Sequence, residues 1–321
     1  MSRFFRAVST LALAGLLTRC ATSSGAGGTA AAGDAVPLRF AWPEGLTVQV
    51  SSTDTTTQSE QAPEHSELSY QLRLEGKGEE RKLITEEMKP TAPAATPEEG
   101  PPPPTPAMVL GPQGELRRIE GIDQVVQQMA QEAESQGLPQ EQQAQITKLV
   151  RDALEQATRL RWEVLVGKWN GLVLKPGEAV ERKGQTTVPL FGSNVATVEH
   201  VSLKEHVPCT EGAKEKRCVR LVLESSIDQA GLAQATDQLL GKVKAVMKAN
   251  MGLEDQALPE LKVTKLRLDS TLEFIAEPET LVPHRQRTVT SSQVELQEPD
   301  ADPKNFDIQS ERVETFTPAG H

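Results

Sequence analysis

A long helical segment, Ile122 to Trp169, divides a chain in which most of the other segments carry the alternation and turn signals of strands. Between Leu138 and Trp169 apolar residues recur at spacings of three and four, which predicts a helix with one buried stripe. We expect this stripe to close the hydrophobic face of the strands. The residues that we predict to line a core, or an apolar pocket beneath the helix, are Ile146, Leu149, Leu154, Leu160, Trp162 and Trp169.

Strand signals lie on both sides of this segment. Ser66 to Leu74 and Leu261 to Ile275 alternate apolar and polar residues, which is typical of half-buried antiparallel strands. A further helix is expected over Asp228 to Met251, and Phe306 to Phe316 is expected to be a last edge strand. Because strands outnumber grouped helices, we predict an α+β fold: antiparallel sheets with amphipathic helices packed on one face.

The body of the chain, 36–321, has a weak internal repeat. Residues 36–169 and 170–321 each run through several strands to a helix, so the body is either one unit or two similar halves. Residues 89–106 are rich in proline and are predicted to form a surface loop in extended polyproline conformations.

The first 20 residues have the order of a secretory leader. Arg3 and Arg6 precede an apolar run, Ala7 to Leu17, that is too short to span a bilayer. We therefore interpret residues 1–20 as a signal peptide. The small residues of 21–35, mainly Ser, Gly and Ala, predict a flexible tether.

Leu17-Thr18-Arg19-Cys20 resembles the lipobox of bacterial lipoproteins, although Arg19 stands where a small residue is usual. The resemblance implies lipidation of Cys20 and export to the cell envelope, with a membrane anchor; free secretion is the alternative. The hairpin Gly171 to Glu178 is similar to one in uncharacterised exported lipoproteins, a group with no established activity.

Cys209 and Cys218 bracket a polar, Gly-containing loop between two apolar runs. A disulfide closing such a hairpin is easily formed and belongs in an oxidising compartment. A metal pair is disfavoured because no further ligand lies near in sequence, and the spacing is too long for a redox motif.

Few other features of the sequence point to a chemical activity. The formal net charge of −11, without a basic stripe, disfavours nucleic acid as a partner. The chain has no phosphate-binding loop and no nucleophile elbow. Glu199-His200 and Glu205-His206 are interpreted as solvent-side strand positions, about 20 Å apart and too distant for one metal. No catalytic residue, metal site or cofactor is predicted.

Three functional hypotheses follow. The leading one is a lipid-anchored envelope lipoprotein that binds or scaffolds an apolar ligand or an envelope protein. In element order and leader the chain resembles periplasmic carriers of lipid or lipoprotein, which implies an alternative: a carrier with an apolar pocket under the helices. The second alternative is an exported hydrolase.

Overall fold

The computed structural model describes residues 34–59, 62–91, 105–135, 140–188, 193–228, 231–233, 236–237, 240–241, 262–297 and 302–319. The signal peptide, the lipidation site Cys20, nearly all of the tether and most of the Pro-rich loop lie outside these ranges and remain predictions. No helix among the described residues is long and apolar enough to cross a membrane.

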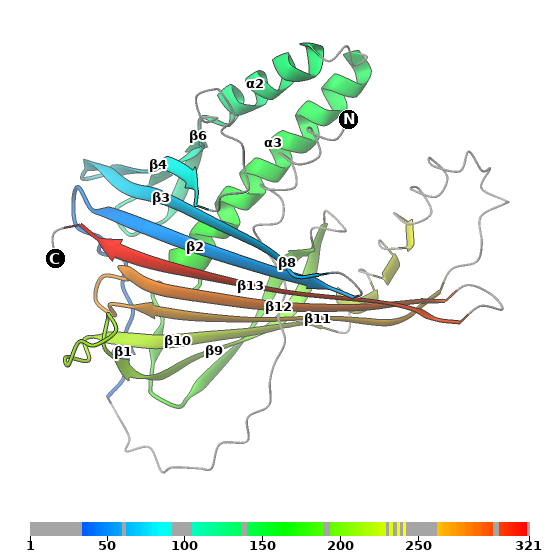
Figure 1. Ribbon diagram of the computed structural model, residues 1–321. Helices are drawn as coiled ribbons and strands as arrows, with labels where there is room; N and C mark the ends of the chain where they lie inside the picture. The colour runs from blue at the N-terminus through cyan, green and yellow to red at the C-terminus, as the bar shows by residue number, and fades with distance from the viewer. Residues whose placement is uncertain are drawn as a thin grey trace.

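The described strands form one eleven-stranded antiparallel sheet, in the order β6-β5-β4-β3-β2-β13-β12-β11-β10-β9-β8 (Figure 1). The chain runs outward from β2 to β6, crosses through the helices to β8 at the other edge, and returns to β13. A short pair, β1 (Val36–Pro37) with β7 (Val173–Leu174), stands apart. The strands of the large sheet are β2 (Thr47–Gln58), β3 (Glu64–Lys77), β4 (Glu80–Pro90), β5 (Ala107–Leu110), β6 (Leu116–Glu120), β8 (Ala179–Val188), β9 (Ser193–Val207), β10 (Cys218–Ile227), β11 (Lys262–Ala276), β12 (Pro283–Gln297) and β13 (Lys304–Pro318).

The prediction that the last strand is an edge strand is wrong. β13 lies in the middle of the sheet, paired with β12 on one side and with β2 on the other. Its pairing with β2 joins segments about 250 residues apart, such as Arg312 with Asp54. Local alternation cannot reveal such a partner, because the periodicity of a strand does not encode which strand lies beside it. This pair joins the two halves of the chain into one continuous sheet.

The strand-rich antiparallel architecture is confirmed, but the packing of the helices differs from the expected layer. The helices are α2 (Ile122–Ser135), α3 (Gln140–Trp162) and the π-helix η1 (Glu163–Gly167). Only the end of α3, η1 and Trp169 join the core of the sheet. The middle of α3 packs against α2 in a separate cluster that includes Val125, Val150 and Leu154, and this helix pair projects beyond the sheet (Figure 1).

The helix predicted over Asp228 to Met251 falls largely outside the described residues. Residues 231–233, 236–237 and 240–241 are described, and these are helical.

The main core lies on one face of the sheet, which we call the inner face. Here the predicted alternation of β3 is confirmed, since Tyr70, Leu72 and Leu74 are all buried. Across this face, the side chains of Phe40, Trp42 and Trp162 pack with ring centroids 5.5 to 5.8 Å apart, and Trp169 stacks on Phe274 at 5.5 Å. The space beneath the end of α3 is therefore filled by aromatic side chains.

Candidate functional site

The six residues predicted to line a core or pocket differ in how far their side chains are buried. Leu154, Trp162 and Trp169 are buried and Leu160 is half-buried. Leu149 is 67% exposed and does not line the core, and the side chain of Ile146 is outside the description. The physical reason is that the buried ridge of α3 follows a spacing of four, and Leu149 is one residue, or about 100° of helix rotation, off that ridge. The ridge consists of Val150, Leu154, Thr158 and Trp162.

An open depression of about 420 Å³ lies between α2 and α3, with Ala130, Ala144 and Thr147 in its lining. It is separate from the packed aromatic side chains beneath the end of α3. The predicted site beneath α3 is therefore a protein core, and a ligand surface has to be sought elsewhere.

The inner face changes character beyond this core. Five neighbouring strands, from β10 through β11, β12 and β13 to β2, each place one hydroxyl-bearing residue directly opposite that of the next strand. We call these five residues the hydroxyl row: Ser225, Ser270, Thr290, Ser310 and Thr56. The row begins beside Glu199 of β9. In the sequence only Ser270 gave a signal, as a polar residue at an apolar position of its strand.

An apolar patch lies past the hydroxyl row, toward the far end of the sheet. Leu266 of β11 pairs with Val294 of β12, which pairs with Phe306 of β13. Val294 belongs to a small buried cluster with Leu268, whereas Phe306 is 48% exposed. These three paired residues, Leu266, Val294 and Phe306, are called the apolar patch below. Apolar and polar surfaces are thus adjacent along the same strands.

A charged cluster stands at the edge-strand end of the hydroxyl row. Glu199 is 3% exposed; its Oε1 lies 2.5 Å from Lys168 Nζ, and its Oε2 accepts a hydrogen bond of 2.8 Å from Arg182 Nε. Arg182 also donates to the backbone oxygen of Lys168. Both carboxylate oxygens of Glu199 are bonded. This side chain of β9 therefore links Lys168, the residue after η1, to Arg182 of β8. The interpretation of Glu199 as a solvent-side position is wrong, whereas the side chain of its neighbour His200 is 45% exposed.

Tyr70 is the single tyrosine of the chain, and its ring is buried on the inner face. Its hydroxyl donates a hydrogen bond of 2.7 Å to Glu314 Oε1, and the guanidinium of Arg161 lies 4.7 Å from its ring centroid. Burial raises the pKa of Tyr70 most strongly; the positive charge of Arg161 opposes this rise, and the charge and hydrogen bond of the Glu314 carboxylate add to it.

We therefore expect no phenolate absorbance from the folded protein as the pH rises past the ordinary tyrosine pKa of about 10. The folded state holds this proton more tightly than the unfolded state. Its contribution to stability is thus complete below about pH 10 and is lost as the pH rises above that value. Alkaline titration of the folded and the urea-unfolded chain measures this difference. A phenol that ionises at the same pH in both states would contradict the expectation.

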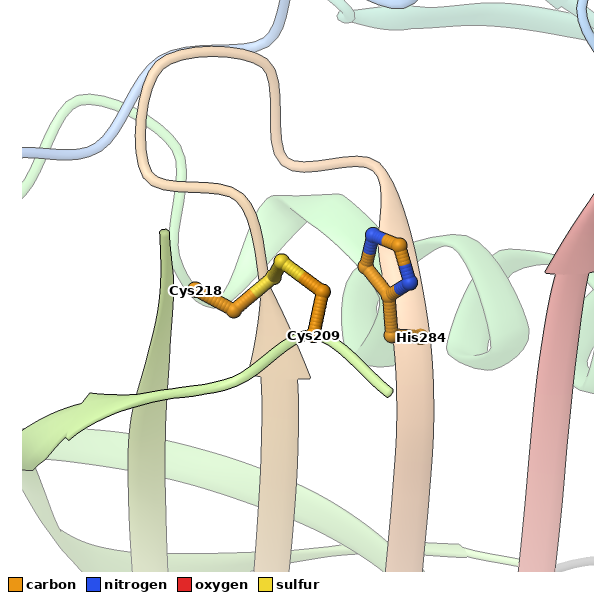
Figure 2. A group of neighbouring side chains, drawn as sticks. All are labelled: Cys209, Cys218 and His284. Atoms are coloured by element: carbon orange, nitrogen blue, oxygen red, sulfur yellow. A yellow bond between two sulfur atoms is a disulfide. The ribbon is translucent and has the colours of Figure 1, made fainter. Parts of the chain in front are cut away.

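The predicted disulfide between Cys209 and Cys218 is confirmed, with Cα atoms 5.0 Å apart. The structure adds a neighbour that sequence reasoning missed. One ring nitrogen of His284, near the start of β12, lies within 4.8 Å of both sulfur atoms (Figure 2). His284 Nε2 is 3.3 Å from Glu277 Oε1, and among the described residues its buried Nδ1 has no hydrogen-bond partner. No spacing in the sequence relates His284 to the two cysteines, because the sheet alone brings them together.

Replacing both cysteines, Cys209→Ser with Cys218→Ser, is expected to lower the free energy of unfolding by about 2.5 kcal/mol. The estimate follows from the loop-closure entropy of a short loop in the unfolded chain. Urea unfolding of the variant and of the oxidised parent measures the difference. If the midpoints coincide, the disulfide contributes nothing to stability.

The comparisons with known proteins are sparse. The chain matches no protein-family model and no curated protein. Among solved structures it is similar to one described as "lipid-protein interactions in lipovitellin", with 9% sequence identity and a TM-score of 0.40. The alignment covers 84% of this chain but only 25% of that chain. A likeness this distant establishes neither a shared fold nor a shared ligand.

Proposed function

We propose that this protein is an exported, lipid-anchored protein of the cell envelope that acts by binding. The observation that supports export is the disulfide between Cys209 and Cys218, because disulfides persist in oxidising compartments. The leader-like order of residues 1–20 and the lipobox-like end at Cys20 support the anchor. Binding rather than catalysis is favoured because the buried carboxylate of Glu199 is fully engaged by two cations.

The intact mass of the mature protein, purified from the membrane fraction of its native host, tests the anchor. We expect a mass that fits a chain beginning at Cys20 with a diacylglyceryl group, rising by two hydrogen atoms on reduction of the disulfide. A mass without lipid and a start beyond Cys20 would overturn the anchor and leave a secreted protein.

A second candidate function is supported by the inner face: a carrier of an amphipathic ligand. An acyl chain would lie on the apolar patch, where Phe306 remains 48% exposed, and the polar group would face the hydroxyl row. Exposed aromatic surface near mostly half-buried hydroxyls matches such a ligand, because apolar sites with a few placed polar groups fix ligand orientation. This site replaces the pocket predicted under the helices. The hydrolase alternative remains a prediction.

Phe306→Ser tests this carrier function, with Val173→Ser as its matched control. Both side chains are exposed, by 48% and 62%, so neither change should unfold the protein. Phe306→Ser should weaken binding of a fluorescent long-chain fatty acid about tenfold, through loss of apolar contact area. Val173→Ser should leave it unchanged. Equal affinities for both variants would exclude the apolar patch as the ligand surface.

A further inference from the structure

At the starts of β10 and β12, the fold gathers the donor atoms of a soft metal site (Figure 2). Two sulfur atoms and one imidazole nitrogen lie within 4.8 Å of one another. We propose that Cys209, Cys218 and His284 form a redox-gated metal site: a disulfide when oxidised, and a site for one thiophilic cation such as Zn²⁺ when reduced. This inference does not depend on the lipid anchor or on the carrier function.

The geometry requires the two sulfurs, bonded in the oxidised state, to move apart, and the imidazole nitrogen to approach them. A tetrahedral zinc ion places two thiolate sulfurs about 3.8 Å apart, and a sulfur and an imidazole nitrogen about 3.6 Å apart. In the oxidised state the nitrogen is already within 4.8 Å of both sulfurs, so the remaining approach is little more than about 1 Å. Cys218 and His284 are held on strands, whereas Cys209 lies in the loop after β9 and can supply the movement.

His284 has one ring nitrogen within 4.8 Å of both sulfurs. Its Nε2 lies 3.3 Å from Glu277 Oε1, and its Nδ1 is on the side of the ring away from the two sulfurs (Figure 2). Nδ1 is buried and lacks a hydrogen-bond partner among the described residues, which is a costly state for a polar atom. A proton on Nδ1 leaves the lone pair of Nε2, the nitrogen on the side of the sulfurs, free for a metal (Figure 2). The Glu277 carboxylate, 3.3 Å from the same nitrogen, places a negative charge beside the metal position.

The chemistry balances with a dithiol as the reductant. The dithiol supplies two electrons and two protons, cleaves the bond between the two sulfurs to give two thiols, and itself becomes a disulfide. Cys209 is partly exposed while Cys218 is fully buried, so the reductant can reach the sulfur of Cys209. Binding of Zn²⁺ then forms two bonds to sulfur and one to nitrogen and releases the two thiol protons. Three protein ligands leave a fourth position for water.

The test uses the full chain carrying Cys20→Ser, so that Cys209 and Cys218 supply the only thiols. A phosphine reduces the disulfide and is removed without oxygen, and Zn²⁺ is titrated against a chromophoric chelator. We expect the reduced chain to bind one equivalent at least 100-fold more tightly than the oxidised chain. Replacing Zn²⁺ by Co²⁺ should give thiolate-to-cobalt charge-transfer absorption in the reduced chain alone.

Three variants locate the site. His284→Ala should lower the zinc affinity of the reduced chain by more than tenfold, and Glu277→Gln should also lower it, because a negative charge beside the cation is lost. His65→Ala, at an exposed position of β3, should leave it unchanged. Circular dichroism checks that each reduced variant is folded, and His284→Asn replaces His284→Ala if the alanine variant is not. Equal zinc binding by reduced and oxidised chains, or by the parent and the folded His284 variant, overturns the proposal.

Discussion

Replacing Trp162 by alanine is expected to lower the free energy of unfolding by about 4 kcal/mol, because it opens a cavity where the helix meets the sheet. The side chain is 2% exposed and packs edge-on against both Phe40 and Trp42. Its Nε1 donates a hydrogen bond of 2.8 Å to the backbone oxygen of Gly114. One residue thus joins the end of α3 to the turn between β5 and β6.

Two further variants separate the contribution of the Trp162 hydrogen bond from that of its buried ring. Trp162→Phe keeps an aromatic ring but leaves the oxygen of Gly114 without its donor, and should cost about 1.5 kcal/mol. Leu149→Ala lies on the same helix at a 67% exposed position and should change stability by less than about 0.5 kcal/mol. Urea denaturation of the three variants measures the differences. A loss for Trp162→Ala as small as that for Leu149→Ala would show that the helix end does not anchor the sheet.

Gly114 shows which part of the contact between α3 and the β5–β6 turn could be predicted from the sequence. Gly111-Pro-Gln-Gly114 predicts a tight turn, and Gly114 adopts a positive φ of 82°. A Cβ atom there would meet the Phe40 ring at 2.6 Å, so the position requires glycine for its backbone and for its packing. The turn was therefore predictable, but its contact with Phe40 and Trp162, distant in sequence, was not.

The same division holds for the whole fold. Period-two alternation predicts strands such as β3 and β11, and the spacing of apolar residues predicts α2 and α3, because each signal is local. The pairing of β13 with β2, the position of His284 beside the disulfide and the hydroxyl row depend on register between distant strands. Single-strand periodicity cannot encode register, so the candidate sites emerge only from the folded sheet.

The burial of Glu199 leads to the second large effect: Glu199→Ala should lower the free energy of unfolding by about 3 kcal/mol. Removing this carboxylate leaves Lys168 and Arg182, whose side chains are 16% and 28% exposed, without a counter-charge. Glu205→Ala on the same strand is the matched control. Glu205 pairs with Arg220 at 2.6 Å, but its side chain is 50% exposed, so water replaces the lost partner at a cost below about 0.5 kcal/mol.

A double variant distinguishes the loss of a counter-charge from the loss of packing. Glu199→Leu combined with Lys168→Met removes one charge of each sign and retains apolar volume, and should recover at least half of the stability lost in Glu199→Ala. Urea unfolding of the single, double and control variants measures these differences. If Glu199→Ala costs no more than Glu205→Ala, the cluster does not fasten the chain after η1 to the edge strands. If the double variant recovers nothing, the hydrogen bonds of Glu199, and not the balance of buried charge, hold that junction together.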